Sequence, residues 1–132
     1  MVRSVLNEKA DQLSNQVIGA AMDVDRILGP GLLESAYEEC LCRELSLRDI
    51  PHMRQVPLPL EYKGVYVDCS YRIDVLVDNC MILEIKSVVR IEPIHEAQLL
   101  TYLRLKNIRL GLLINFNVPV LKDGLSRLVN GW

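Results

Sequence analysis

The chain has 132 residues, half of them hydrophobic, and a formal net charge of -2. This length predicts a single domain, residues 1–132, with room for one sizeable core. A charge so close to neutral gives no global support for nucleic-acid binding. No apolar run is long enough to cross a bilayer and the first residues lack a secretory hydrophobic segment, so we expect a cytoplasmic protein without a membrane partner.

Charge is distributed unevenly along the chain. Residues 1–85 carry 8 basic and 14 acidic side chains, whereas residues 86–132 carry 7 basic and 3 acidic ones. One part of the protein could therefore face phosphate while the other does not, although halves of a sequence are not surfaces.

Two amphipathic helices are predicted in the first part of the chain. Apolar side chains recur with the helical period over about residues 15–28, where Ser14 is a plausible N-cap, and again over about residues 33–47. Gly29-Pro30-Gly31 lies between them. This turn lacks the Gly-Lys-Ser/Thr ending of a phosphate loop and no strand precedes it, so we interpret it as a helix–helix corner.

The second predicted helix carries two glutamates on one face. Glu34 and Glu38 are four residues apart, which places their side chains one above the other. Such a pair is usually solvated charge. Beside an acidic metal site, however, one of them could supply a further carboxylate.

Strands and one further helix are predicted in the rest of the chain. Residues 55–62 alternate in polarity and contain two prolines, which suggests an edge strand, and Lys63-Gly64 turns into a strand that continues through residue 77. A strand from residue 81, a helix over about 94–105, a strand over 109–116 and a short element over 125–129 follow. The order helix, helix, strands, helix, strand predicts an α/β sandwich with a mixed sheet.

The segment 72–86 contains two short apolar strands around an Asp-Asn turn, with charged residues on both. If the strands pair about Asn79, Asp74 lies opposite Glu84. Because side chains alternate along a strand, Asp74, Glu84 and Lys86 then share one face. The other face is apolar, and its residues are Ile73, Val75, Val77, Leu83 and Ile85.

Two carboxylates directly opposite each other in a ladder repel, so the pair needs a cation. A hard divalent ion such as Mg²⁺ or Mn²⁺ takes oxygen ligands of this kind and usually keeps some bound water. Lys86 would lie where it could hold or polarise one of those waters.

Two alternatives remain open from these residues. The charged face could simply meet water in a half-exposed hairpin, and a turn centred between Asp78 and Asn79 would place Asp74 opposite Leu83. The second strand is nearly all apolar apart from Glu84, Lys86 and Ser87, however, which suggests burial on both faces. A buried carboxylate is costly unless it is paired or metal-bound.

Other candidate metal or nucleophile sites lack the required spacing. The four cysteines show no Cys-x-x-Cys pair and no Cys/His ligand pattern, so we expect reduced buried thiols, although spacing alone does not exclude an iron–sulfur cluster. These cysteines are Cys40, Cys42, Cys69 and Cys80. His95-Glu96 begins like a zinc-binding helix, but Leu99 stands where the second histidine would be.

An Asp followed about ten residues later, on the next strand, by Glu-x-Lys resembles the PD-(D/E)xK nuclease superfamily. Further segments are similar to the small bacterial and archaeal GxxxR proteins, a subgroup assigned to that superfamily. These segments are residues 28–38, 55–58, 71–74, 84–86, 95–103 and 111–116. The resemblance spans nearly the whole chain from about residue 14.

This resemblance implies a restriction-endonuclease-like three-layer sandwich, in which a mixed central sheet is flanked by helices. It implies that Asp74 and Glu84 bind Mg²⁺, or Mn²⁺, and that Lys86 orients the attacking water. Glu34 matches a helix-borne acidic residue that adds to the metal site, with Glu38 as the less favoured occupant of that role. Gln98 matches a catalytic position, and Tyr102 one near the substrate phosphate.

The sequence differs from this subgroup at Asp25, where the Val-His-Arg pattern has His. Asp25 lies outside the catalytic motif, so this departure concerns a supporting or binding role and leaves the predicted metal site unchanged.

The resulting hypothesis is a metal-dependent nuclease that hydrolyses phosphodiester bonds in DNA. The alternative is a catalytically inactive nuclease-like fold that binds a protein or a nucleic acid, and a plain oligomeric scaffold would leave the charged groups of the apolar strand unexplained. A homodimer is expected by analogy, because a duplex has two strands to cut and the chain is small.

Overall fold

The computed structural model describes residues 2–68 and 71–131, and the side chains from residue 8 onward. The helices are α1 (Val2–Leu28), α2 (Glu34–Leu47) and α3 (Pro93–Lys106), with a short 3-10 helix η1 (Leu121–Gly124). The strands are β1 (His52–Pro57), β2 (Leu60–Tyr62), β3 (Val65–Val67), β4 (Arg72–Val77), β5 (Met81–Lys86), β6 (Leu110–Asn115) and β7 (Leu125–Val129).

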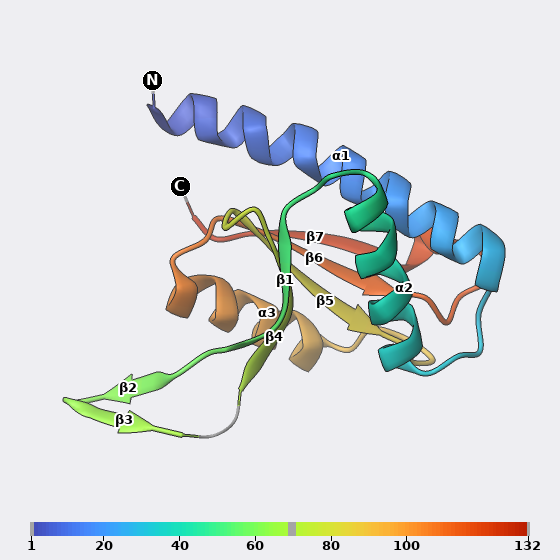
Figure 1. The fold of residues 1–132 in the computed structure, drawn as a ribbon. Helices are drawn as coiled ribbons and strands as arrows, with labels where there is room; N and C mark the ends of the chain where they lie inside the picture. Colours follow the sequence, from blue (N-terminus) through green and yellow to red (C-terminus); the bar gives the residue numbers. More distant parts are fainter. Residues whose placement is uncertain (1, 69–70, 132) are drawn as a thin grey trace.

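Five of these strands form one mixed sheet, in the order β1-β4-β5-β6-β7 (Figure 1). Strands β5 and β6 are parallel, and the other neighbouring pairs are antiparallel. A parallel pair needs a long crossover connection, which α3 provides here. The predicted mixed sheet is confirmed.

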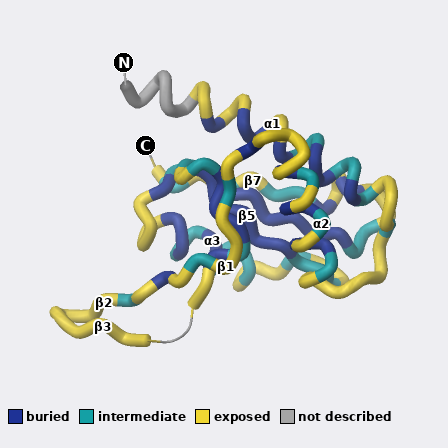
Figure 2. The backbone as a smooth tube through the Cα atoms, viewed as in Figure 1, coloured by how far each residue is buried: buried dark blue, intermediate teal, exposed yellow. Residues whose placement is uncertain are grey.

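Helices cover both faces of this sheet. The first hydrophobic cluster packs buried residues of α1 and α2 against one face, and the second packs α3 against the other. Figure 2 shows the central strands between these helices as buried along most of their length, whereas the edge strand β1 is mostly exposed. The predicted three-layer sandwich is therefore confirmed.

Helix α1 begins far earlier than the sequence predicted. Its helical conformation starts at Val2, so the expected N-cap at Ser14 is wrong: Ser14 is fully buried within the helix, and its hydroxyl oxygen has no hydrogen-bond partner among the described residues. Ala10 and Leu13 are also buried in the first cluster. This packing extends the apolar stripe upstream of Ser14 and keeps the helix regular there.

The Gly29-Pro30-Gly31 turn joins the two helices as a corner, which confirms the predicted interpretation. Tyr37 Oη donates to the Gly29 carbonyl at 2.5 Å and accepts a hydrogen bond from the Leu32 amide at 3.1 Å. The Tyr37 ring also stacks on Phe116, with 4.5 Å between ring centroids. The corner is thus fixed to α2 and to the end of β6.

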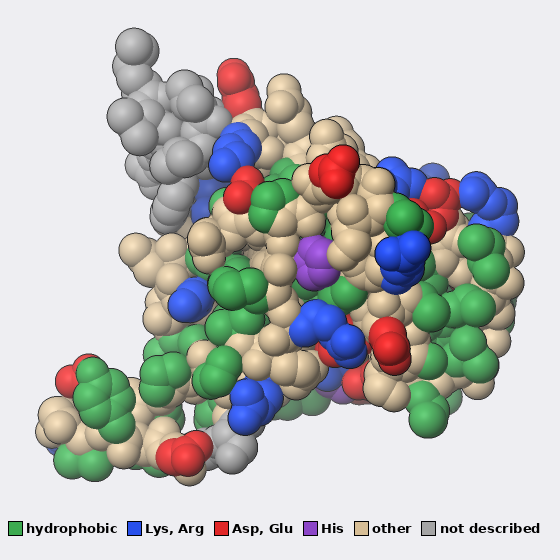
Figure 3. All heavy atoms as spheres, viewed as in Figure 1, with side chains coloured by type: hydrophobic (Ala, Val, Ile, Leu, Met, Phe, Trp, Pro, Cys, Tyr) green, Lys and Arg blue, Asp and Glu red, His purple; other side chains and the backbone are tan. Residues whose placement is uncertain are grey.

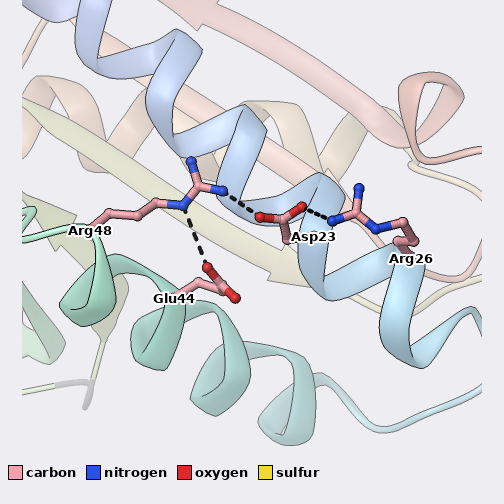
Figure 4. A network of polar contacts seen from close by, with 4 residues as sticks. All are labelled: Asp23, Arg26, Glu44 and Arg48. Carbon is pink, nitrogen blue, oxygen red and sulfur yellow. Dashed lines mark hydrogen bonds and ion pairs between the residues drawn. The ribbon is translucent and has the colours of Figure 1, made fainter.

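A polar network on the outer surface also links α1 to α2 (Figure 4). Asp23 accepts hydrogen bonds from Arg26 and Arg48, and Arg48 Nε donates to Glu44 at 3.4 Å. The hydrogen bond from Arg48 is the main cause that lowers the pKa of Asp23. On the same helix the Oδ1 atom of Asp25 is buried and has no hydrogen-bond partner among the described residues.

The predicted strand over residues 55–62 is divided into two. Strand β1 begins at His52 and ends at Pro57 on the sheet edge, whereas β2 pairs only with β3 in a separate hairpin. Lys63 and Gly64 have positive φ angles of 49° and 83°, which is typical of a tight hairpin turn. We call this hairpin, Leu60–Val67, the β2–β3 arm; it projects from the body of the protein (Figure 1).

The continuous strand expected from residue 65 to residue 77 is also wrong, because β3 ends at Val67 and β4 begins at Arg72. The arm leaves the sheet between these two positions. Among the described residues, β3 pairs with β2 alone, so β3 does not extend into the main sheet.

Three of the four cysteines lie in the described part of the chain, and all three are free thiols. Cys42 is buried, which raises the pKa of its thiol to about 11, while Cys40 and Cys80 are partly exposed. Cys69 lies outside the described residues. Among the described helices, none combines the length and the apolar character that a membrane span needs.

Replacing Gly124 should destabilise the fold. A Cβ at Gly124 would lie far inside the van der Waals contact distance of the Asn115 carbonyl oxygen, and backbone cannot rotate away as a side chain could. We expect Gly124→Ala to lower the free energy of unfolding by about 1–3 kcal/mol in urea denaturation. Gly131→Ala is the control, since a Cβ there meets nothing within 4 Å; equal stabilities of the two variants would contradict this packing.

Candidate active site

The hairpin of β4 and β5 has the register that places two carboxylates opposite each other. Val75 pairs with Leu83, and Val77 with Met81, so the turn is centred on Asn79. Asp78 and Asn79 both have positive φ angles, 48° and 54°. The alternative register, with Asp74 opposite Leu83, is excluded.

The alternation of faces is interrupted at Asp74. Val75, Val77, Leu83 and Ile85 belong to the cluster under α1 and α2, as predicted, but the prediction for Ile73 is wrong, because this residue packs in the cluster under α3. The recorded β4–β5 pairs end at Val75–Leu83, and Asp74 Oδ2 accepts the Ile85 amide proton at 2.9 Å. The Asp74 carboxylate thus accepts a hydrogen bond from a backbone amide of β5 at the point where regular strand pairing ends.

The neighbouring strand β1 is distorted at the same level. Arg54 pairs with Val75 and Val56 with Ile73, but no pair is recorded between Gln55 and Asp74. Gln55 has a φ angle of 50°, an uncommon conformation for a residue with a side chain. Irregular backbone on both sides of Asp74 explains why strict alternation does not extend to Ile73.

Glu84 lies in a nearly dry environment beside Asp74. Its side chain is only 5% exposed, and its Oε1 atom is buried with no hydrogen-bond partner among the described residues. Burial raises the pKa of Glu84 to about 9, and the charge of Asp74 and a hydrogen bond between the two side chains add to this shift. The charge of Lys86 lowers the pKa, so the ammonium group is close enough to act on the same carboxyl.

These residues fit a divalent cation at the Asp74–Glu84 pair. An unpartnered, buried carboxylate oxygen beside a second carboxylate is a ligand set suited to a hard ion, which would replace the proton that Glu84 otherwise holds. Among residues 2–68 and 71–131, however, no group of three or more His, Cys, Asp or Glu side chains is close enough to hold a metal. Mg²⁺ commonly uses one or two carboxylates and completes its shell with water.

Glu34 lies near the site without joining the two carboxylates. It is the first residue of α2 and is exposed, and its Oε2 atom accepts a long hydrogen bond, 3.4 Å, from the Ser87 amide just after β5. This contact brings Glu34 to the end of the strand that carries Glu84 and Lys86. Its role as a metal ligand stays a prediction.

Gln98 and Tyr102 approach the carboxylates from α3. Gln98 Nε2 donates to Tyr102 Oη at 3.0 Å. Burial is the main cause that raises the pKa of Tyr102, followed by the charge of Glu84, whereas the hydrogen bond from Gln98 lowers it. The two α3 residues therefore lie on the side of the sheet where the carboxylates meet.

Sequence reasoning missed the partners of Glu38. This glutamate is buried, and its Oε2 atom accepts hydrogen bonds from Arg54 Nε at 3.2 Å and from the terminal Arg54 nitrogen Nη2 at 2.8 Å. Gln55 Nε2 donates to Glu38 Oε1 at 2.9 Å. Both carboxylate oxygens are thus engaged by β1. The available sequence signal was a basic residue, Arg54, directly before the amide residue that begins the predicted edge strand.

Asn115 is a second residue whose role was missed. It is 1% exposed, and its side chain accepts the Val88 amide proton at 3.1 Å and donates to the Val88 carbonyl at 3.0 Å. The Phe116 amide also donates to the Lys86 carbonyl at 3.0 Å. The chain is therefore fixed immediately after Lys86. The sequence signal for this role was the amide side chain of Asn115 at the end of an otherwise apolar segment.

Comparison with protein-family models matches residues 11–128 to the PD-(D/E)XK nuclease superfamily. The chain belongs to this superfamily. The match covers all the helices and strands apart from the start of α1 and the last residue of β7. A PD-(D/E)XK nuclease is a phosphodiesterase acting on nucleic acid, and the superfamily typically uses divalent metals. Neither the curated proteins nor the solved structures that were compared give a match to the chain.

Removing Arg54 should leave a buried charge without its partner. We expect Arg54→Met to lower the free energy of unfolding by about 1–3 kcal/mol in urea, because Glu38 loses its charged donor. Arg90→Met is the control: the Arg90–Glu92 pair is exposed, so its loss should cost less than about 1 kcal/mol. Adding Glu38→Gln to Arg54→Met should recover part of the loss, and no recovery would contradict the assignment.

Glu84 should make the stability of the metal-free protein depend on pH. Its pKa is raised from 4.5 when unfolded to about 9 when folded. The folded state therefore holds the proton more tightly, and this contribution to stability is complete below about pH 4.5 and is lost as the pH rises towards about 9.

The measurement is the melting temperature in chelator as a function of pH. The difference between the wild type and Glu84→Gln, which cannot titrate at this position, should shrink or reverse in sign between about pH 5 and about pH 9. If the difference in melting temperature between the two proteins does not change with pH, Glu84 is ionised over the whole of this pH range and its pKa is not raised.

Proposed function

We propose that this protein hydrolyses phosphodiester bonds in DNA with the help of a divalent metal ion, Mg²⁺ or Mn²⁺. The observation that carries the proposal is the buried Glu84 beside the half-buried Asp74: one carboxylate oxygen of Glu84 has no hydrogen-bond partner among the described residues, and the charge of Lys86 acts on the same carboxyl. Membership of the PD-(D/E)XK superfamily supports the reaction class.

Each residue has a proposed role in this reaction. Asp74 and Glu84 hold the ion, and Glu34 is proposed as a further acidic group at the end of β5. The ion, when bound, neutralises charge on the phosphate and acidifies a water molecule. Lys86 orients the attacking water by donating to it. Gln98 donates towards the reacting groups, and Tyr102 contacts the substrate phosphate.

The acidic balance of residues 1–85 does not prevent phosphate from approaching this site. A divalent ion held by Asp74 and Glu84 would cancel the negative charge of the two carboxylates. Arg72 is exposed two residues before Asp74, and one of its guanidinium nitrogens donates to the Gln55 carbonyl at 3.3 Å. This arginine supplies a positive group next to the proposed metal site.

Several finer points belong to this proposal as predictions. The GxxxR subgroup, DNA as the substrate, a cytoplasmic location, a homodimer and a single nuclease-like domain over residues 1–132 follow from the sequence reasoning. Analytical ultracentrifugation at working concentration measures the oligomeric state directly.

A binding module without catalysis is the second candidate. The absence of a three-residue ligand group among the described residues favours it, because a looser site would hold metal weakly. Calorimetry distinguishes the two: a nuclease requires divalent-ion binding that Asp74→Asn abolishes, whereas the module would bind a partner with no metal at all.

Lys86→Ala should fold normally and lose metal-dependent cleavage. Loss of a residue that positions or polarises the water is expected to slow cleavage roughly 100-fold or more. The assay follows nicking and degradation of labelled single-stranded and duplex DNA with Mg²⁺ or Mn²⁺, and circular dichroism verifies the fold. Lys122→Ala, at an exposed position, is the matched control. Cleavage by Lys86→Ala at the wild-type rate would exclude this site as its source.

A further inference from the structure

A hollow of about 300 Å³ lies where the β2–β3 arm meets the main sheet. Tyr66 lines it from the arm and Pro59 from the residue just before the arm, whereas Arg72 lines it from the start of β4 and Tyr71 from the residue before β4. Asp68 also contributes to the wall. The hollow is thus built from aromatic rings, a proline and a guanidinium group rather than from aliphatic side chains alone.

This hollow adjoins the proposed active site through two tyrosines. The rings of Tyr71 and Tyr102 meet edge to face, with centroids 6.1 Å apart and an interplanar angle of 61°. Tyr102 is near enough to Glu84 for the charge of that carboxylate to raise its pKa. Arg72 and Asp74 are two residues apart on β4. A ligand in the hollow would therefore lie next to the carboxylates.

The exposed rings are available for stacking. Tyr66 is 74% exposed and Tyr71 is 42% exposed, although aromatic side chains are mostly buried in folded proteins. Figure 3 shows hydrophobic side chains gathered over the arm, at the lower left of that view, where they face solvent. Aromatic rings beside a positive group are how proteins bind single-stranded nucleic acid, because every base offers a π face.

Arg72 is oriented for a phosphate beside such a base. One guanidinium nitrogen donates to the Gln55 carbonyl, which fixes the side chain, and arginine has five donors in all. A guanidinium group matches the geometry of a phosphate, to which it can donate two parallel hydrogen bonds. Glu61 is exposed on the arm and carries the opposite charge, so this region is poorly suited to tracking both backbones of a duplex.

We propose that this hollow binds one unpaired nucleotide of the substrate, with its base stacked on Tyr66 and Tyr71 and its phosphate on Arg72. A base inside a duplex is paired and stacked and cannot enter such a space. The inference rests on the proposed nuclease function and narrows its substrate to nucleic acid that is unpaired next to the bond to be cut.

Binding measurements with the intact protein test the proposal. Lys86→Ala protein with Mg²⁺ is titrated, by fluorescence anisotropy, into labelled oligothymidylate, oligouridylate and a blunt duplex of equal length. Tyr66→Ala and Arg72→Ala, each added to this background, should weaken single-strand binding about tenfold. Tyr62→Ala is the matched control, since Tyr62 is exposed on the same arm but does not line the hollow.

The proposal further expects tighter binding to the single strands than to the duplex, and a duplex affinity that Tyr66→Ala leaves unchanged. Comparison of oligothymidylate with oligouridylate identifies the preferred sugar. Single-strand affinity that is unaffected by Tyr66→Ala, equal losses in Tyr66→Ala and Tyr62→Ala, or duplex binding as tight as single-strand binding would overturn it. Absence of any nucleic-acid binding would overturn it as well.

The outcomes separate this inference from the proposed function. If the wild type cleaves DNA but Tyr66→Ala binds and cleaves like it, the nuclease function stands and the unpaired-nucleotide site is wrong. If Tyr66→Ala and Arg72→Ala weaken binding while cleavage is the same with and without Lys86, the binding site stands and the catalytic proposal is wrong.

Discussion

The structure depends on keeping the carboxyl group of the buried Glu84 beside that of the half-buried Asp74. Burial of Glu84 beside Asp74 opposes ionisation of the pair, so the pair needs either a proton or a cation. A proton is the minimum compensation, and it leaves one oxygen of Glu84 without a hydrogen-bond partner in the described part of the chain. A divalent ion could satisfy both acids at once, and this requirement explains why the surrounding elements are arranged as they are.

The sheet provides this arrangement because its strand pairing is irregular around Asp74. Regular pairing of β4 with β5 ends next to Asp74, whose carboxylate takes the Ile85 amide. On the other side Gln55 adopts a left-handed conformation and directs its side chain to Glu38. Backbone strain of this kind persists only where the surroundings over-determine it, and it is concentrated at functional sites. Glu38 is hydrogen-bonded to residues of β1 on one side of the site, and Asn115 is hydrogen-bonded to the chain just after β5 on the other. These contacts hold the backbone on both sides of the two carboxylates.

Much of this arrangement could be predicted from the sequence because it depends on local patterns. The Asp-Asn turn set the register in which Val75 pairs with Leu83, next to Asp74 and Glu84, and the apolar period and Gly29-Pro30-Gly31 gave the two helices and their corner. Gln98 and Tyr102, one helical turn apart, do meet each other. The family match over residues 11–128 agrees with the resemblance at the level of the superfamily.

The errors arose where tertiary contacts override local preference. Ser14 resembled an N-cap, but burial of Ala10 and Leu13 continues the helix through it. Ile73 was assigned to the wrong face because alternation fails beside Asp74. The contacts of Glu38 join residues 16 and 17 positions apart, and the spacing of charges along the sequence does not report such pairs.

The β2–β3 arm differs from the rest of the molecule because its strands bury none of their residues. The buried residues of both hydrophobic clusters come from other parts of the chain. Insertions, deletions or exchanges of side chains in the arm would therefore leave the folding free energy nearly unchanged. Selectivity for a ligand could then diverge among relatives of this protein without a matching change in their thermal stability.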